Sequence, residues 1–98
     1  MGYERNAAHE RADGRKIKVK LLYFVQLPDV FGKDQEEVFL PKEVTNIQQL
    51  LEWLRARGKQ YNDLLKDDIV TVTINKSFAE PFTVLEEGDE IAIVPKPN

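Results

Sequence analysis

The stretch GDEIAIVPKPN, residues 88–98, decides how this chain folds. Its first three residues have the composition of a tight turn, and residues 91–94 are a short apolar run typical of a strand. Because side chains alternate along a strand, we expect the two isoleucines to point inward and Ala92 and Val94 to point outward. The last four residues, PKPN, are stiff and polar, and they predict an exposed stub after the strand.

Residues 16–24, KIKVKLLYF, predict a second strand whose two faces differ. Its odd-numbered positions are apolar throughout and are expected in the core. Its even-numbered positions begin with lysines and end with Leu22 and Phe24. An ordinary solvated face does not require that change, so this second face is a candidate for contact with another molecule.

Five segments lie between these two strands in addition to the main helix. Residues 27–32 predict a short helical turn, residues 36–40 a strand, and the β-branched run 69–74 a central strand. Residues 62–68 predict a connecting segment, and residues 77–82 a short irregular edge.

The main helix is the clearest element of the chain. Thr45 and Gln48 fit a capping box, in which the hydroxyl and the amide satisfy backbone groups of the first helical turn. Four apolar residues then recur at the spacing of one helical face: Ile47, Leu50, Leu51 and Leu54. We expect this face to cover one side of the sheet.

The order strand, strand, helix, strand, short edge, strand predicts an α+β fold, with a mixed sheet of four to five strands packed on one main helix. The first and last strands are expected side by side in the middle of the sheet. Residues 1–15 are polar and lack periodicity, so they predict a disordered N-terminal segment. Residues 16–98 are expected to form the folded domain.

Composition excludes several functions. The chain has 98 residues, a net charge of −3 and no cysteine, which removes thiolate catalysis, iron–sulfur clusters and zinc–thiolate sites. The single histidine, His9, makes no metal site by itself. Scattered basic residues argue against nucleic acid, and no apolar run approaches the roughly 20 residues of a membrane span. A cytoplasmic location suits this composition, and no cofactor or metal is expected.

Four stretches together resemble the β-grasp (ubiquitin-like) sulfur carriers of the MoaD/ThiS type. They are IKVKLLYFVQL at 17–27, Phe31-Gly32, VTVTINKSF at 70–78 and VLEEGDEIAIVP at 84–95. Their order and spacing are most similar to the small subunit of molybdopterin synthase. The resemblance covers residues 16–95 and implies a β-grasp domain.

The resemblance also implies a function in molybdenum cofactor biosynthesis. Such proteins carry sulfur as a C-terminal thiocarboxylate. An E1-like adenylating enzyme activates the terminal carboxylate, and the large subunit of molybdopterin synthase consumes the sulfur. The chain would then be the carrier subunit of a sulfurtransferase-type synthase rather than an enzyme by itself.

The carrier terminus departs from the family pattern. The family ends in two glycines, whose lack of a Cβ lets the backbone thread a narrow active site, whereas this sequence ends in Pro97 and Asn98. A shortened sequence, a diverged relative or a tail completed in another way would each explain the difference. The alternative function is therefore a β-grasp binding module that keeps the partner surface but has lost sulfur transfer.

Strand alternation also predicts a partner-binding surface without the resemblance. Side chains on the outer face near the end of the chain form an apolar cluster, which marks an interaction site. Its expected members are Leu22, Phe24, Phe78, Ala92 and Val94, continued by Pro95 and Lys96 of the tail. In the family that the chain resembles, apolar residues at the positions of Phe24, Phe78 and Val94 contact the large subunit. The alternative is that an additional loop covers the cluster within the domain.

Overall fold

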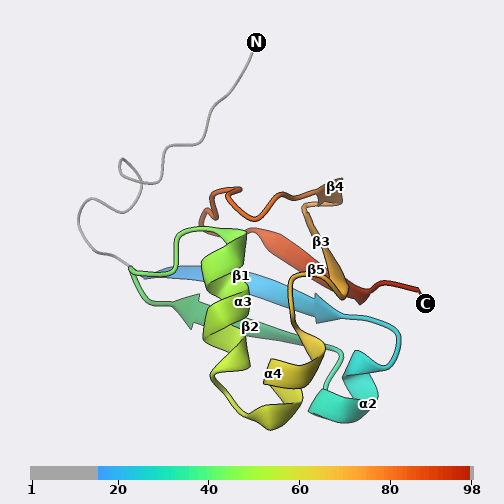
Figure 1. The fold of residues 1–98 in the computed structure, drawn as a ribbon. Helices are drawn as coiled ribbons and strands as arrows, with labels where there is room; N and C mark the ends of the chain where they lie inside the picture. The colour runs from blue at the N-terminus through green and yellow to red at the C-terminus, as the bar shows by residue number, and fades with distance from the viewer. Residues whose placement is uncertain (1–15, 98) are drawn as a thin grey trace.

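The computed structural model describes residues 16–97, which form a five-stranded sheet and three helices (Figure 1). The expected 1–15 segment and Asn98 lie outside the described residues. In chain order the elements are β1 (Ile17–Tyr23), α2 (Leu27–Phe31), β2 (Gln35–Leu40), α3 (Ile47–Arg55), α4 (Lys59–Leu64), β3 (Val70–Ile74), β4 (Ser77–Phe78) and β5 (Glu90–Pro95).

The sheet is mixed, with the strand order β2-β1-β5-β3-β4. β1 pairs antiparallel with β2 and parallel with β5, and β3 pairs antiparallel with both β5 and β4. The first and last strands therefore lie together in the middle, as the sequence predicts. The predicted parity of β1 is also confirmed, since Ile17, Val19, Leu21 and Tyr23 are all buried.

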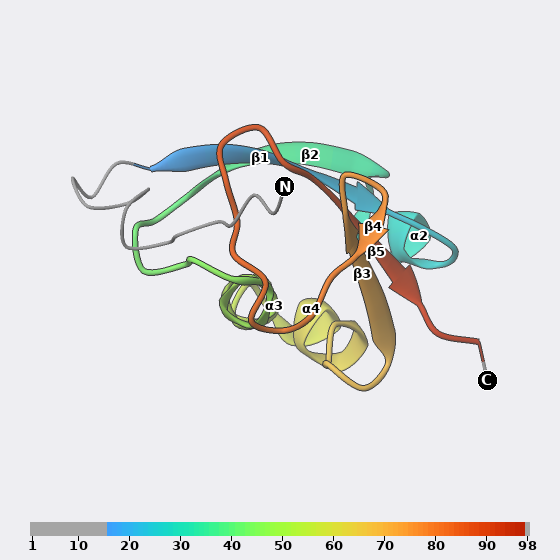
Figure 2. The ribbon, with the colours of Figure 1, turned by 90° about the horizontal axis from the view of Figure 1, so that it is seen from above.

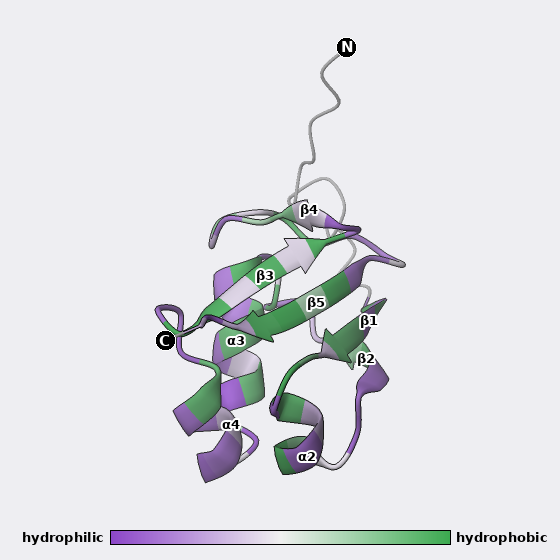
Figure 3. Cartoon of the chain, turned by 90° about the vertical axis from the view of Figure 1, so that its right-hand side faces the viewer, coloured by the Kyte–Doolittle hydropathy of each residue, from purple (hydrophilic) through white to green (hydrophobic). Residues whose placement is uncertain are grey.

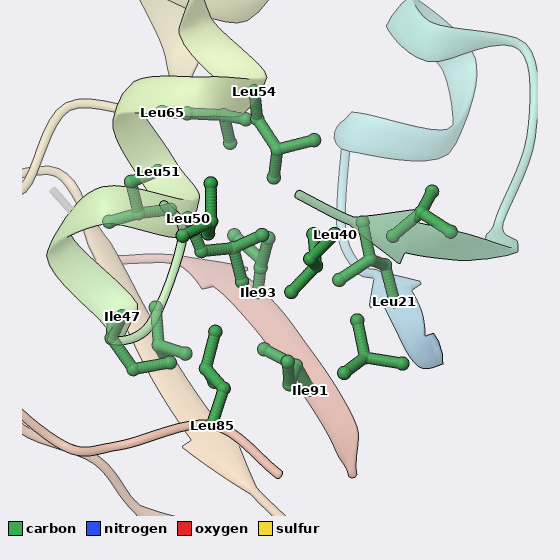
Figure 4. Close-up of a cluster of buried hydrophobic side chains, with 14 of the residues drawn as sticks. Leu21, Leu40, Ile47, Leu50, Leu51, Leu54, Leu65, Leu85, Ile91 and Ile93 are labelled. Carbon is green, nitrogen blue, oxygen red and sulfur yellow. The ribbon is translucent and has the colours of Figure 1, made fainter. Parts of the chain in front are cut away.

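Helix α3 covers one face of this sheet, and α4 lies on the same side (Figure 2). All four residues of the predicted apolar stripe of α3 are buried. They meet the inward side chains of the central strands, among them Leu21, Ile91 and Ile93 (Figure 4). Burying each such side chain contributes about 1.5–3 kcal/mol. Among residues 16–97, no helix covers the opposite face of the sheet, and the candidate site lies on that face.

The predicted capping box is wrong by one residue. The N-cap of α3 is Asn46, whose Oδ1 accepts from the Gln49 backbone N–H at 2.9 Å. The side chain of Gln49 reaches back to Thr45, accepting from its N–H at 2.7 Å and its hydroxyl at 2.8 Å. Asn46 is extended, as a cap must be, so the helix starts at Ile47.

The predicted connection at residues 62–68 overlaps the end of a helix, α4, which begins at Lys59 and ends at Leu64. An ion pair between Lys59 and Asp63 at 2.8 Å spans one of its turns. Tyr61 stacks on Phe31 of α2, with ring centroids 4.1 Å apart and an interplanar angle of 8°. So short a helix depends on tertiary contacts for its stability, which explains why no local repeat reveals it.

Candidate partner-binding face

The register of the sheet builds one row of side chains across its outer face. Leu22 of β1 lies opposite Ala92 of β5, Ala92 lies opposite Thr73 of β3, and Thr73 lies opposite Phe78 of β4. Directly opposed residues in adjacent strands point to the same side of a sheet. The four residues therefore share the face that α3 leaves open.

A second row lies nearer the C-terminal end of β5. The Phe24 N–H donates to the Ile93 carbonyl at 3.3 Å, which carries Phe24 beside Val94. Val94 in turn lies opposite Thr71. The chain leaves the sheet at Val25, whose φ of 61° lies in the left-handed region that β-branched residues disfavour.

The two rows enclose a shallow groove of about 480 Å³. Eight residues line it: Leu22, Phe24, Val25, Thr73, Lys76, Glu90, Ala92 and Val94. Phe24 is 43% exposed, and no loop within residues 16–97 covers it. The alternative of a covering loop is therefore wrong for the part of the chain that the structure describes. Figure 3 looks onto this side, where β5 is largely hydrophobic and α3 lies behind the sheet.

Phe78 extends the apolar surface beyond this groove. It stands at the edge of the sheet on β4 and is 84% exposed. It lines a separate small hollow with residues that include Ala79 and Thr83. The structure thus brings four of the predicted residues into one groove and places Phe78 one strand away from its floor.

The predicted tail residues lie at the end of the face rather than in it. Pro95 ends β5 opposite Val70, and the Lys96 N–H donates to the Ile69 carbonyl at 2.9 Å. The Lys96 side chain borders another cavity, on the α3 side of β3. Pro97 is exposed. The chain is consequently held by the sheet as far as Lys96.

A polar network positions the start of β5, and sequence reasoning assigned it no role. Asn75 adopts a left-handed φ of 51°, and its Nδ2 donates to the buried carboxylate of Asp89 at 3.0 Å. Its Oδ1 accepts from the Glu90 N–H at 2.9 Å. The second Asp89 oxygen accepts from the Glu86 N–H at 2.7 Å. These bonds fix β5 against β3, and so place Ala92 opposite Thr73. Asn75 and Asp89 lie in the stretches 70–78 and 84–95, and their residue types are the sequence signal that could have indicated this network.

Within residues 16–97, no cluster of histidine, cysteine or carboxylate side chains could hold a metal ion. The same residues contain no helix long and apolar enough to cross a membrane.

A five-stranded mixed sheet that grasps one main helix is the β-grasp fold, and an open apolar face beside its last strand is a surface suited to a protein partner. The molecule thus has the β-grasp, ubiquitin-like fold. Residues 21–97 match the ThiS family, and the chain belongs to that family. The predicted fold and family are confirmed.

Solved structures share the fold of this chain. The chain is similar to a Pyrococcus furiosus protein provisionally assigned as molybdopterin converting factor, subunit 1, with 25% identity over 83% of this chain and 99% of that one and a TM-score of 0.70. SAMP1 from Haloferax volcanii is 19% identical over 83% and 97% of the two chains, with a TM-score of 0.65. The small archaeal modifier protein 1 from Methanosarcina acetivorans is 22% identical over 84% and 95%, with a TM-score of 0.60. The two modifier proteins share the fold.

Proposed function

We propose that this chain is the sulfur-carrier subunit of a molybdopterin-synthase-type enzyme, working in molybdenum cofactor biosynthesis. Its membership of the ThiS family supports a sulfur carrier. The similarity to the converting-factor subunit from Pyrococcus furiosus, over almost the whole of that protein, supports the molybdopterin branch. The single observation that carries the proposal is the open apolar groove beside β5, the strand that leads into the tail.

The proposed chemistry takes place at the C-terminal carboxylate. An E1-like enzyme transfers AMP from ATP to that carboxylate, and pyrophosphate leaves. A sulfur nucleophile then displaces AMP and leaves a thiocarboxylate, which the large synthase subunit uses as its sulfur source. In this proposal, residues 16–97 of the carrier contribute no acid, base or metal ion to these steps.

The geometry suits such a role because docking and delivery use the same strand. Ala92 and Val94 form part of the groove, and three residues after Val94 the described chain is already in solvent. A partner that binds the groove therefore holds the tail close to its own active site. Restricting the reacting group in this way supplies much of the rate advantage of an intramolecular reaction.

Intact-mass spectrometry of the protein isolated from its native host tests the proposal. The expected result is a species heavier by the exchange of one oxygen for sulfur, which disappears after incubation with the large subunit and its substrate. An unmodified mass in all preparations, combined with tight binding to another protein, would overturn sulfur transfer and favour the binding-module function.

A further inference from the structure

The place where the chain leaves the sheet depends on a turn in another part of the molecule. After β5 the Lys96 N–H donates to the Ile69 carbonyl at 2.9 Å, and Pro97 has no N–H. Lys96 is therefore the last of residues 16–97 to donate a backbone hydrogen bond. Its acceptor lies in the segment between α4 and β3, and Figure 3 shows the chain leaving β5 beside that segment. The position of this carbonyl determines where the residues after Lys96 start.

A short turn presents the Ile69 carbonyl. The Ile69 N–H donates to the Lys66 carbonyl at 3.1 Å and closes the turn of residues 66–69. The residue before the turn is well anchored, since Leu65 is buried and its N–H donates to the Tyr61 carbonyl at 3.0 Å. The four residues of the turn are exposed, however, and exposed segments with few contacts open locally at low free-energy cost. A contact from outside the turn is needed to keep it in place.

Arg55, the last residue of α3, makes that contact. Its Nη1 donates to the Leu65 carbonyl at 2.8 Å and to Asp67 Oδ1 at 3.3 Å. The guanidinium thus holds the residue before the turn and a residue within it. Its side chain is 20% exposed, so this is not a fully solvated ion pair of the kind that contributes little. Because α3 is packed on the sheet, Arg55 joins the exposed turn to the rigid part of the domain.

We propose that Arg55 is a positioning residue for the reacting end of the chain. It acts through the 66–69 turn, whose Ile69 carbonyl holds Lys96. This inference rests on the proposed function, in which the partners act on the terminal carboxylate. A terminus that starts from a fixed point has a higher effective concentration in a docked partner's active site, because fewer of its conformations lie elsewhere. Arg55 does not line the groove, so its effect is separate from docking.

Hydrogen exchange tests the structural part of the proposal. Arg55→Met keeps an unbranched apolar side chain but removes both hydrogen bonds. Exchange of the Lys96 amide is expected to become at least about fivefold faster relative to amides in the middle of β5. Arg57→Met is the matched control, since it removes an ion pair with Glu36 of 2.7 Å near the same end of α3. An unchanged Lys96 amide in the Arg55 variant, or equal acceleration in both variants, would overturn the role of Arg55.

Single-turnover adenylation by the E1-like enzyme tests the functional part. Arg55→Met is expected to lower the rate at saturating carrier by at least about fivefold, and to change the half-saturating concentration by less than about twofold. Arg57→Met is expected to leave both quantities close to those of the wild type. Arg55→Lys still has a donor for the Leu65 carbonyl and is expected to restore part of the rate. An unchanged rate for Arg55→Met, or a change in half-saturation alone, would overturn the inference and leave the proposed function standing.

A double variant tests whether the effect passes through the Lys96 bond. Lys96→Pro removes the N–H donor and so releases the chain from the Ile69 carbonyl directly. In that background Arg55→Met is expected to cause no further loss of rate, because residues that act through one contact are not additive. A further loss as large as that in the wild-type background would overturn the role of the turn. If the wild-type protein is not adenylated at all, the proposed function fails, and with it the role of Arg55 in the reaction.

Discussion

The phenol of Tyr23 and the guanidinium of Arg57 both donate to one carboxylate oxygen, Oε2 of Glu36. The Arg57 bond is 2.7 Å long, and its guanidinium also lies over the rings of Trp53 and Tyr61, at 5.3 and 5.4 Å from their centroids. Burial, reinforced by Glu36, raises the pKa of Tyr23 above its usual range, so the phenol remains a donor. This network joins β1 and β2 to the segment that follows α3.

Glu36→Gln is expected to destabilise the protein by about 1–2 kcal/mol at neutral pH, because it removes a charge-assisted pair. Burial alone would raise the pKa of Glu36, but hydrogen bonds from Arg57 and Tyr23 bring it below its ordinary value of 4.5. The stabilisation is therefore complete above pH 4.5 and is lost as the pH falls through the folded-state pKa. Denaturant unfolding at pH 7 and pH 3 would measure it. A difference between wild type and variant that does not shrink at low pH would contradict the assignment.

Val25→Asn is expected to raise the free energy of unfolding by about 1 kcal/mol, because Asn tolerates the left-handed conformation that strains valine. Val25 is 71% exposed, so little packing is lost with its side chain. Val25→Ile keeps the β-branch and serves as the control, with no gain in stability. Thermal and denaturant unfolding would compare the three proteins. Equal stability of all three would show that the left-handed backbone conformation at this position costs valine no measurable free energy.

Asn75→Ala is expected to cost about 2–3 kcal/mol, since it removes one hydrogen bond to the buried Asp89 carboxylate and one from the Glu90 N–H, and leaves a residue at positive φ without a compensating side chain. Asn75→Gly keeps the conformational freedom but loses the same bonds, and is expected to cost less. Unfolding curves of the two variants therefore separate the two contributions. Asp89 is only 4% exposed, so a negligible effect of both substitutions would contradict its role in fixing β5.

Phe24→Asp is expected to leave the fold intact and to weaken binding of the large subunit by more than about 2 kcal/mol, because aromatic anchors dominate interface energies. Phe39→Asp makes the same chemical change on the same face outside the groove, and is expected to have little effect. Isothermal titration calorimetry would measure both. Unchanged affinity of the Phe24 variant would remove this face from the interface.

Strand parity was predictable because it has a period of two and needs no knowledge of distant contacts. The helix cap was harder to place, since the sequence offers two adjacent frames with equivalent chemistry, Thr45 with Gln48 and Asn46 with Gln49. The structure uses the second frame. Helix α4 could not be found locally, because its stacking partner Phe31 lies far away in the sequence.

The residues of the candidate site likewise fall into two groups, those that the sequence predicts and those that it does not. Leu22, Phe24, Ala92 and Val94 follow from alternation along two strands, and the groove contains all four. Thr73 joins them only through the register between β3 and β5, which a single sequence does not specify. Val25 joins through an unusual backbone angle for which no local pattern exists.

The pairing of β5 on both sides has a mechanical consequence. A force applied to the tail acts along the strand, so it loads the bonds to β1 and to β3 together in shear instead of opening them one by one. The bond from Lys96 to Ile69 is the first to bear that load. Among the described residues only Pro97 lies beyond this bond, so a pull on the tail is resisted by the sheet from Lys96 inward.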